Sequence, residues 1–200
     1  MIALSATARG TKELSRLLGG NAKKLKREIA VAVNATAKST VSAWAKEVSD
    51  EVATAQKNIK KTIKVTKKAA GFFSTTPSAV VKQKETARIP LRDFKARQTN
   101  AGVTYRIAKS GKPAKIPGAF IVQSFGGHVF TRIGAKVKAT KGRYKGRMRQ
   151  RIDKKYGPSP WGVSLRNDIK QKLLQPTEAK LIEEINKRIR FLKLKQSGAI

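Results

Sequence analysis

An excess of positive charge is the feature that most limits how this chain can fold. Its 200 residues include 45 Lys and Arg but only 12 Asp and Glu, which gives a formal net charge of +33. Like charges in such excess repel one another and oppose a compact state unless counter-charge is supplied from outside. We therefore expect an anionic partner, which is a nucleic acid, an anionic membrane or an acidic protein surface.

The rest of the composition narrows this choice. No run of about 18 apolar residues exists, so we expect neither a membrane span nor a membrane partner. Residues 1–6 lack the charged start and apolar core of a secretory signal. The chain has no Cys, which excludes disulfides, thiolate chemistry and a metal site built on Cys. These features favour a reducing, cytoplasmic setting.

The first half of the chain has helical spacing. From Asn21, a suitable N-cap, to about Val52, apolar residues recur at steps of mostly three and four and mark one helical face. They are Leu25, Ile29, Val33, Val41, Trp44, Val48 and Val52. A shorter helix is expected at residues 14–18. Residues 53–70 fit either a basic amphipathic helix or a helix that passes into a strand.

From about residue 79 the apolar residues alternate with polar ones, which predicts half-buried strands. The runs with this character are 80–81, 89–91 and 103–107. Gly126 and Gly127 separate two further runs, 119–124 and 128–133, which predicts a hairpin. Pro90 and Pro117 each remove a ladder donor, so we expect them at edges or strand starts.

The last forty residues return to helical spacing. A short helical stretch is expected through Leu174, and Pro176 fits the first turn of a separate final helix. That helix has a narrow apolar stripe at Leu181, Ile182, Ile185, Ile189 and Leu192. The order helix, sheet, helix predicts an α+β fold, with a long N-terminal helix packed on a small, mainly antiparallel sheet and with C-terminal helices. We expect residues 1–200 to form a single domain.

The sequence offers few groups for catalysis. His128 is the only histidine, so a His-based metal cluster or a His-centred triad lacks partners. Glu183 and Glu184 are adjacent on a predicted helix and point to different sides, so they do not form a carboxylate pair. No Gly-Lys pair stands in the full spacing of a phosphate loop. We expect no enzyme, and hence no catalytic residue, metal ion or cofactor.

A basic segment at residues 134–160 is the strongest physical signal, because no acidic residue lies between Asp93 and Asp153. Its candidate contacts to DNA or to an acidic partner are Lys136, Lys138, Lys141, Arg143, Lys145, Arg147, Arg149 and Arg151. Tyr144 is available to stack on a base. No base-reading motif accompanies the segment, so DNA contacts would be with backbone phosphate. Complementary charge would steer the segment to an acidic protein ring equally well. The third interpretation is a solvated loop that orders only on assembly.

A motif before this segment resembles a known family. Its residues are Ile116, Pro117, Gly118, Ala119, Phe120 and Ile121, followed by His128. This stretch is similar to the best-marked segment of the minor tail protein Z (tail completion) family of tailed bacteriophages, which also has an Ala-rich N-terminal helix and two C-terminal helices like 163–174 and 177–193. Physically, Pro117 and Gly118 are expected to form a turn that starts a strand, with Phe120 and Ile121 on opposite faces.

The resemblance implies a structural virion protein in the neck, at the head-proximal end of the tail, that completes the tail and supports head–tail joining and DNA passage. It also implies a ring, expected as a homo-hexamer, that docks on tail terminator and head–tail connector proteins and is assembled in the bacterial host cytoplasm. No residue-level match extends past Gly134, so the basic segment's partner stays open between phage DNA and acidic protein. The alternative is a free nucleic-acid-binding protein, associated with ribosomes or the nucleoid, which leaves the motif unexplained.

Overall fold

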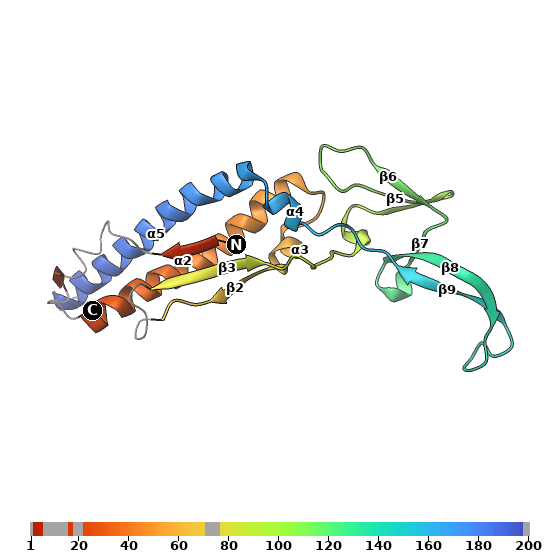
Figure 1. The fold of residues 1–200 in the computed structure, drawn as a ribbon, viewed down its shortest axis with the longest axis horizontal. Helices are drawn as coiled ribbons and strands as arrows, with labels where there is room; N and C mark the ends of the chain where they lie inside the picture. The colour runs from red at the N-terminus through yellow and green to blue at the C-terminus, as the bar shows by residue number, and fades with distance from the viewer. Residues whose placement is uncertain (1, 6–15, 18–21, 71–76, 198–200) are drawn as a thin grey trace. The chain divides into compact units, whose positions relative to one another are not determined.

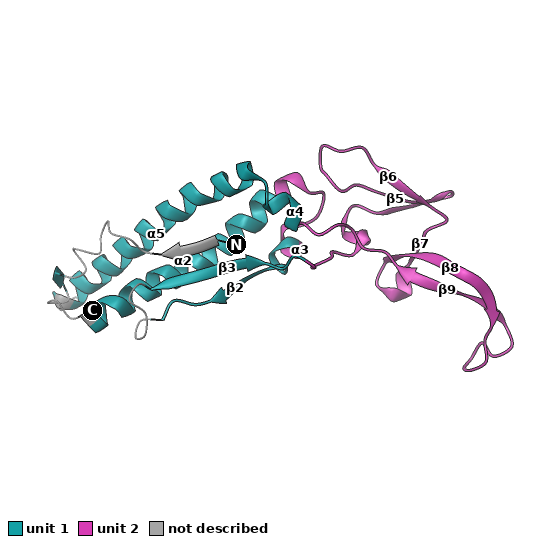
Figure 2. Ribbon diagram, viewed as in Figure 1, with its two compact units in different colours: residues 1–48, 59–85, 161–200 teal, residues 49–58, 86–160 magenta. Residues whose placement is uncertain are grey.

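The structure, a computed structural model, describes residues 2–5, 16–17, 22–70 and 77–197 (Figure 1). It divides into two compact units that alternate along the sequence (Figure 2). Unit 1 contains residues 1–48, 59–85 and 161–200, and unit 2 contains residues 49–58 and 86–160. The predicted α+β class is confirmed, since a long N-terminal helix, small antiparallel sheets and C-terminal helices are all present. That the whole chain acts as a single domain stays a prediction.

Helix α2, Ala22–Glu51, confirms the long N-terminal helix and supplies much of the core of unit 1. Its buried residues form two rows at steps of four, one from Ile29 to Ala45 and one from Ala32 to Val48. Two such rows make an apolar face broad enough to be covered from more than one side. The buried hydroxyl of Thr36 donates to the carbonyl oxygen of Ala32 at 3.0 Å, so it is not left unsatisfied. The expected cap at Asn21 and most of the short helix at 14–18 lie outside the described residues.

Helix α5, Asn167–Gln196, corrects the prediction of two separate helices at 163–174 and 177–193. Pro176 lies inside α5 and not in the first turn of a new helix. A proline there removes one backbone hydrogen bond, but burial continues on both sides of it at steps of four. The buried residues are Ile169, Leu173, Thr177, Ile185 and Ile189. Burial of this continuous row offsets the local cost of the proline. Only the short helix α4, Trp161–Ser164, precedes α5 in this part of the chain.

Helices α2 and α5 lie side by side and run antiparallel. The hydroxyl oxygens of Thr40 and Thr177 are 3.5 Å apart. Nearer the other end of α5, Arg188 lies 3.9 Å from the carboxylate of Glu28. Neither helix, nor any other in the described residues, has the apolar length that a membrane span requires.

The sheet of unit 1 has the strand order β1-β3-β2 and is antiparallel throughout. Its strands are β1, Ile2–Ser5, β2, Ile63–Lys67, and β3, Ser78–Gln83. Helix α3, Gln56–Lys60, precedes β2, so residues 53–70 are a helix that passes into a strand. The side-chain amide of Asn34 on α2 pairs with both backbone groups of Ala69, at 3.0 and 2.8 Å, and so ties the chain after β2 to the core helix.

Unit 2 contains two antiparallel sheets, ordered β4-β5-β6 and β7-β8-β9. Their strands are β4, Arg97–Thr99, β5, Gly102–Tyr105, β6, Ala114–Pro117, β7, Phe120–Val122, β8, His128–Lys138, and β9, Met148–Lys154. The predicted hairpin across Gly126 and Gly127 is confirmed by the pairing of β7 with β8. Pro117 ends an edge strand, as expected.

The prediction of a strand at residues 89–91 is wrong. Pro90 forms only an isolated bridge with Tyr156, and a 3-10 helix, η1, follows at Leu91–Asp93. Because proline has no backbone N–H, it cannot continue a ladder at this position. The buried Ile89 and Leu91 therefore pack as parts of an irregular segment and not of a sheet.

A tight contact between Gly157 and the Phe94 ring provides a test of packing in unit 2. A Cβ at Gly157 would overlap this fully buried ring. Gly157→Ala should lower the free energy of unfolding by about 1–3 kcal/mol, because overpacking forces the ring and the backbone to shift. Urea unfolding measures the loss. Gly162→Ala is the matched control, since no atom lies within 4 Å of a Cβ there, and it should leave stability unchanged or slightly higher. Equal losses in both variants would contradict the packing argument.

Candidate interface on unit 2

The motif connects the two sheets of unit 2. Ile116 and Pro117 end β6, and Phe120 and Ile121 begin β7. Between them Gly118 has a φ of +66°, in the left-handed region that glycine adopts without a steric penalty. The turn therefore lies at Pro117 and Gly118, as predicted, and strand β7 begins after it.

Gln98 on β4 holds this turn in place, a role that no sequence pattern indicates. Its Oε1 accepts a hydrogen bond from the backbone N–H of Ile121 at 2.8 Å. Its Nε2 lies 3.2 Å from the carbonyl oxygen of Gly102 and 3.5 Å from that of Ala119. One amide side chain thus links β4, β5 and β7. Only its long-range partners identify it, because a polar residue on a short strand carries no periodic signal.

An aromatic cluster lies on one face of the β7–β8 hairpin. Phe120 is paired with Phe130, and their ring centroids are 6.3 Å apart. Phe125 meets Phe130 edge-on at 5.8 Å, and the guanidinium of Arg132 lies 4.6 Å above the ring of Phe120. Val129, on the opposite face, is fully buried. Phe120 and Ile121 of the motif therefore lie on one strand of a packed pair.

His128 begins β8 and contacts Lys154 on β9. An ammonium group can only donate hydrogen bonds, so Lys154 donates to Nε2 of the imidazole at 2.9 Å. The ring proton is then on Nδ1, which is buried and has no hydrogen-bond partner. Burial lowers the pKa of His128, the charges of Lys154 and Arg92 lower it further, and Asp93 opposes them. His128 is therefore a neutral strand residue at neutral pH.

The basic segment forms a hairpin, which we call the basic arm and define as residues 134–154. It consists of the end of β8, a tip at 139–147, and β9. The sequence did not predict these strands. The partners of β7 on β8 end at Phe130, so along the arm, among the strands that the structure describes, β8 pairs only with β9 and both outer edges are open. The tip is closed by two backbone hydrogen bonds between Ala139 and the pair Gly146 and Arg147, at 2.8 and 2.9 Å.

The arm presents all eight predicted contact residues to solvent. Lys136 and Lys138 lie on β8 and Arg149 and Arg151 on β9. The other four lie in the tip: Lys141, Arg143, Lys145 and Arg147. In the described part of the chain, none of the eight has an ion-pair partner within 4.0 Å. Tyr144, expected to be available for stacking, lies instead 4.1 Å beneath the guanidinium of Arg149.

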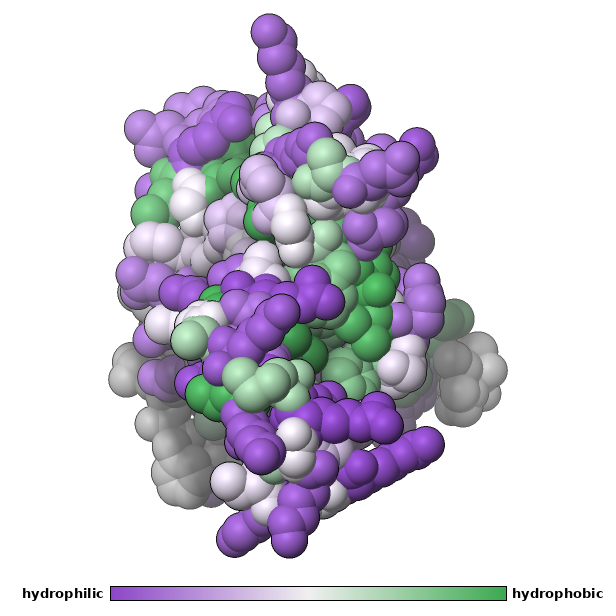
Figure 3. Space-filling view, turned by 90° about the vertical axis from the view of Figure 1, so that its right-hand side faces the viewer, coloured by the Kyte–Doolittle hydropathy of each residue, from purple (hydrophilic) through white to green (hydrophobic). Residues whose placement is uncertain are grey.

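Apolar side chains are exposed on the arm among the basic ones. Val137 is 63% exposed and Met148 is 60% exposed. In the strand register they are paired with Arg149 and Lys138, which places one apolar and one basic residue together on each face of the hairpin. In the view of Figure 3, hydrophobic side chains also appear in patches between hydrophilic ones. A two-stranded hairpin with exposed apolar groups has little stability of its own and gains from contact with a partner.

Among the described residues, no three His, Cys, Asp or Glu side chains gather as metal ligands would. The family model of prophage minor tail protein Z matches residues 10–196, and the chain therefore belongs to this family. No curated protein and no solved structure matches it. Membership makes the protein a structural component of the phage tail, and hence of the virion, and favours a non-enzymatic role.

The single histidine permits a direct test of the arrangement at the base of the arm. In an NMR titration of the folded protein, the pKa of His128 should lie below 6.5, because burial and the nearby cations disfavour the imidazolium. Between that lowered pKa and 6.5 the unfolded chain binds more protons than the folded one. The contribution of this group to stability is therefore complete above pH 6.5 and is lost as the pH falls through this window.

Lys154→Met is the control for this titration. It removes one of the two cations while the ring keeps most of its burial, so the pKa of His128 should rise toward its ordinary value. A pKa at or above 6.5 in the unmodified protein would show that the histidine is not held as the structure places it.

Proposed function

We propose that this protein completes the head-proximal end of the phage tail and supports head–tail joining and DNA passage, and that its basic arm docks on an acidic protein surface of the neck. The observation that carries the proposal is the arm itself. It combines eight exposed cations with open strand edges and with exposed Val137 and Met148. An acidic partner supplies the counter-charge that a chain of +33 needs.

The surface chemistry of the arm favours protein over DNA as this partner. Contact with a phosphate backbone uses cations alone, whereas exposed apolar side chains and free backbone edges are matched by a protein groove or by an added strand. DNA must also leave through the tail, and tight static binding of its phosphates would oppose that movement. A protein partner would contact the open edges and the apolar residues, whereas a phosphate backbone would contact neither.

The arrangement of copies is a further proposal, which rests on the family resemblance and not on the charge. We propose a ring, expected as a homo-hexamer, assembled in the host cytoplasm between the tail terminator and the head–tail connector proteins. Copies with a net charge of +33 repel one another in isolation. Stable ring formation should therefore require the acidic neighbours, whose charge steers and registers the subunits.

The second candidate is a free nucleic-acid-binding protein, associated with ribosomes or the nucleoid. The net charge of +33 favours it. Such a protein would bind nucleic acid without any tail partner and would lose affinity steeply as salt is added.

Quantitative mass spectrometry of purified phage particles tests the location. The copy number of this protein should equal that of a neck component known to form a single ring, because the proposal places one ring in each particle. Absence from particles, with recovery of the protein on ribosomes or on nucleic acid, would establish the second candidate instead.

Charge reversal in the arm tests its role. The triple variant Arg143→Glu, Arg147→Glu and Arg151→Glu should abolish assembly of infectious particles, because each substitution places an anion against an acidic surface. The control, Lys64→Glu, Lys84→Glu and Lys112→Glu, makes the same change in net charge at exposed positions outside the arm and should still assemble. Normal particles from the arm variant would remove the arm from the mechanism.

A neutral variant separates the two kinds of partner in the same assay. Val137→Ser with Met148→Ser leaves the charge of the arm unchanged and removes its exposed apolar groups. Assembly should fall if the arm docks on protein, because the lost apolar contact weakens docking. Unchanged assembly would favour contact with phosphate alone.

A further inference from the structure

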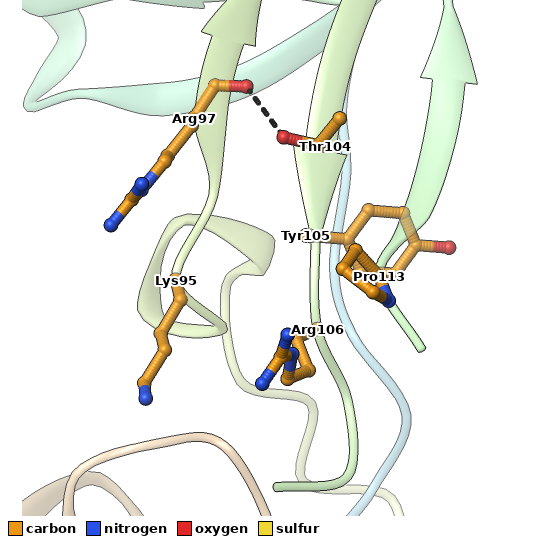
Figure 4. A pocket seen from close by; sticks show the side chains of 6 residues that line it. All are labelled: Lys95, Arg97, Thr104, Tyr105, Arg106 and Pro113. Atoms are coloured by element: carbon orange, nitrogen blue, oxygen red, sulfur yellow. Dashed lines mark hydrogen bonds between the residues drawn. The ribbon is translucent and has the colours of Figure 1, made fainter. Parts of the chain in front are cut away.

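A cavity of about 300 Å³ lies beside β4 and β5, apart from the motif and the arm (Figure 4). Its lining is Lys95, Arg97, Thr104, Tyr105, Arg106 and Pro113. Three of these six residues are cationic and none is acidic. Clustered like charges repel one another, so such a lining is stable only if solvent or an anion compensates it.

Backbone pairing brings the cations together. Arg97 on β4 is paired with Thr104 on β5, whose hydroxyl lies 3.5 Å from the carbonyl oxygen of Arg97. Just beyond β5, the backbone N–H of Arg106 donates to the carbonyl oxygen of Phe94 at 2.9 Å, which holds Arg106 beside the start of β4. Figure 4 shows Lys95, Arg97 and Arg106 on one side, with the ring of Tyr105 directed to the other, beside Pro113.

Lys95 has an unusual backbone conformation. Its φ of +54° is the only positive value at a non-glycine residue in the described ranges. A side chain in this left-handed region carries a steric cost that Gly would avoid, and such strain concentrates at functional sites. The fully buried Phe94 before it anchors the turn. Lys95 is one of the residues that line the cavity, and it contributes an ammonium group that glycine could not supply.

The acidic residues of unit 2 do not neutralise this cluster. Asp50 lies 3.6 Å from Lys109, and Asp153 lies 3.0 Å from Lys155. Asp93, the nearest in sequence, lies 3.5 Å from Arg92. Glu51, the fourth, is not among the lining residues. Among the described residues, no ion pair involves the three cations of the cavity, and the Arg106 guanidinium lies 3.5 Å from the carbonyl oxygen of Lys109. Solvent or an external anion therefore compensates their charge.

We propose that this cavity binds a phosphate group. Two guanidinium groups and an ammonium group line the cavity and provide charged donors, which suits a multiply charged anion such as phosphate. The group is either free phosphate or the terminal phosphate of a nucleic acid, since both present the same oxygens. This site is independent of the proposed docking of the arm, which requires none of these residues.

Calorimetric titration of the full-length protein with inorganic phosphate, at constant ionic strength set by sodium chloride, tests the site. Arg97→Gln with Arg106→Gln should weaken binding at least tenfold, because both guanidinium donors are lost. Lys112→Gln with Lys115→Gln removes the same charge from exposed positions that do not line the cavity and should change affinity less than twofold. Equal weakening in both variants, or no binding by the unmodified protein, would overturn the proposal.

Lys95→Gly separates binding from folding. Glycine adopts a positive φ freely, so the thermal unfolding midpoint should not fall, while affinity for phosphate should fall. A lower midpoint with unchanged affinity would assign Lys95 a purely structural role and would count against the site.

Competition with a trinucleotide identifies the source of the phosphate. Displacement of inorganic phosphate only by the 5′-phosphorylated form points to a nucleic-acid end, and displacement by neither form points to the free ion. Both results support a site for one phosphate group. Equal displacement by the phosphorylated and unphosphorylated forms would overturn it, because it would report diffuse attraction along the backbone.

Discussion

Mutual repulsion of the basic side chains is the constraint with which every other part of this structure has to be compatible. Several of the few acidic residues are placed beside cations, as where Lys180 and Lys187 flank Glu183 and lower its pKa to about 2. Exposed pairs of this kind contribute little to stability. The compact state of unit 1 therefore depends on apolar burial, to which α2 contributes Val33 and α5 contributes Leu173, both almost fully enclosed.

An element of the fold or of the candidate site could be predicted from the sequence where its pattern involves only neighbouring residues. The spacing from Ile29 to Val48 predicted α2, and Gly126–Gly127 predicted the hairpin, because helical periodicity and turn chemistry are local properties. Pro176 misled for the same reason: its local preference was outweighed by burial on both sides of it. The strands of the arm, the role of Gln98 and the phosphate cavity depend on pairings between distant residues, which a single sequence does not display.

Strand β8 connects the hairpin that contains the motif with the arm. The first residues of β8 are packed by Phe120 and Phe125 of the motif hairpin, and the last residues continue into the arm. A strand fixed at one end by an aromatic cluster and by β7 can present its other end with little support. The motif is apolar and turn-rich, whereas the exposed cations of the arm lie outside it. The motif holds the arm in place, and the arm carries the charge.

The division into units has a mechanical consequence. The chain passes between unit 1 and unit 2 after residues 48, 58, 85 and 160. Several covalent connections thus join unit 2 to unit 1, and any tension applied to the arm is divided among them. Tension also reaches unit 1 at the end of α2 and at the start of α4, two points next to its helical core. A pull on the arm is therefore not concentrated on one connection from which the chain could unravel.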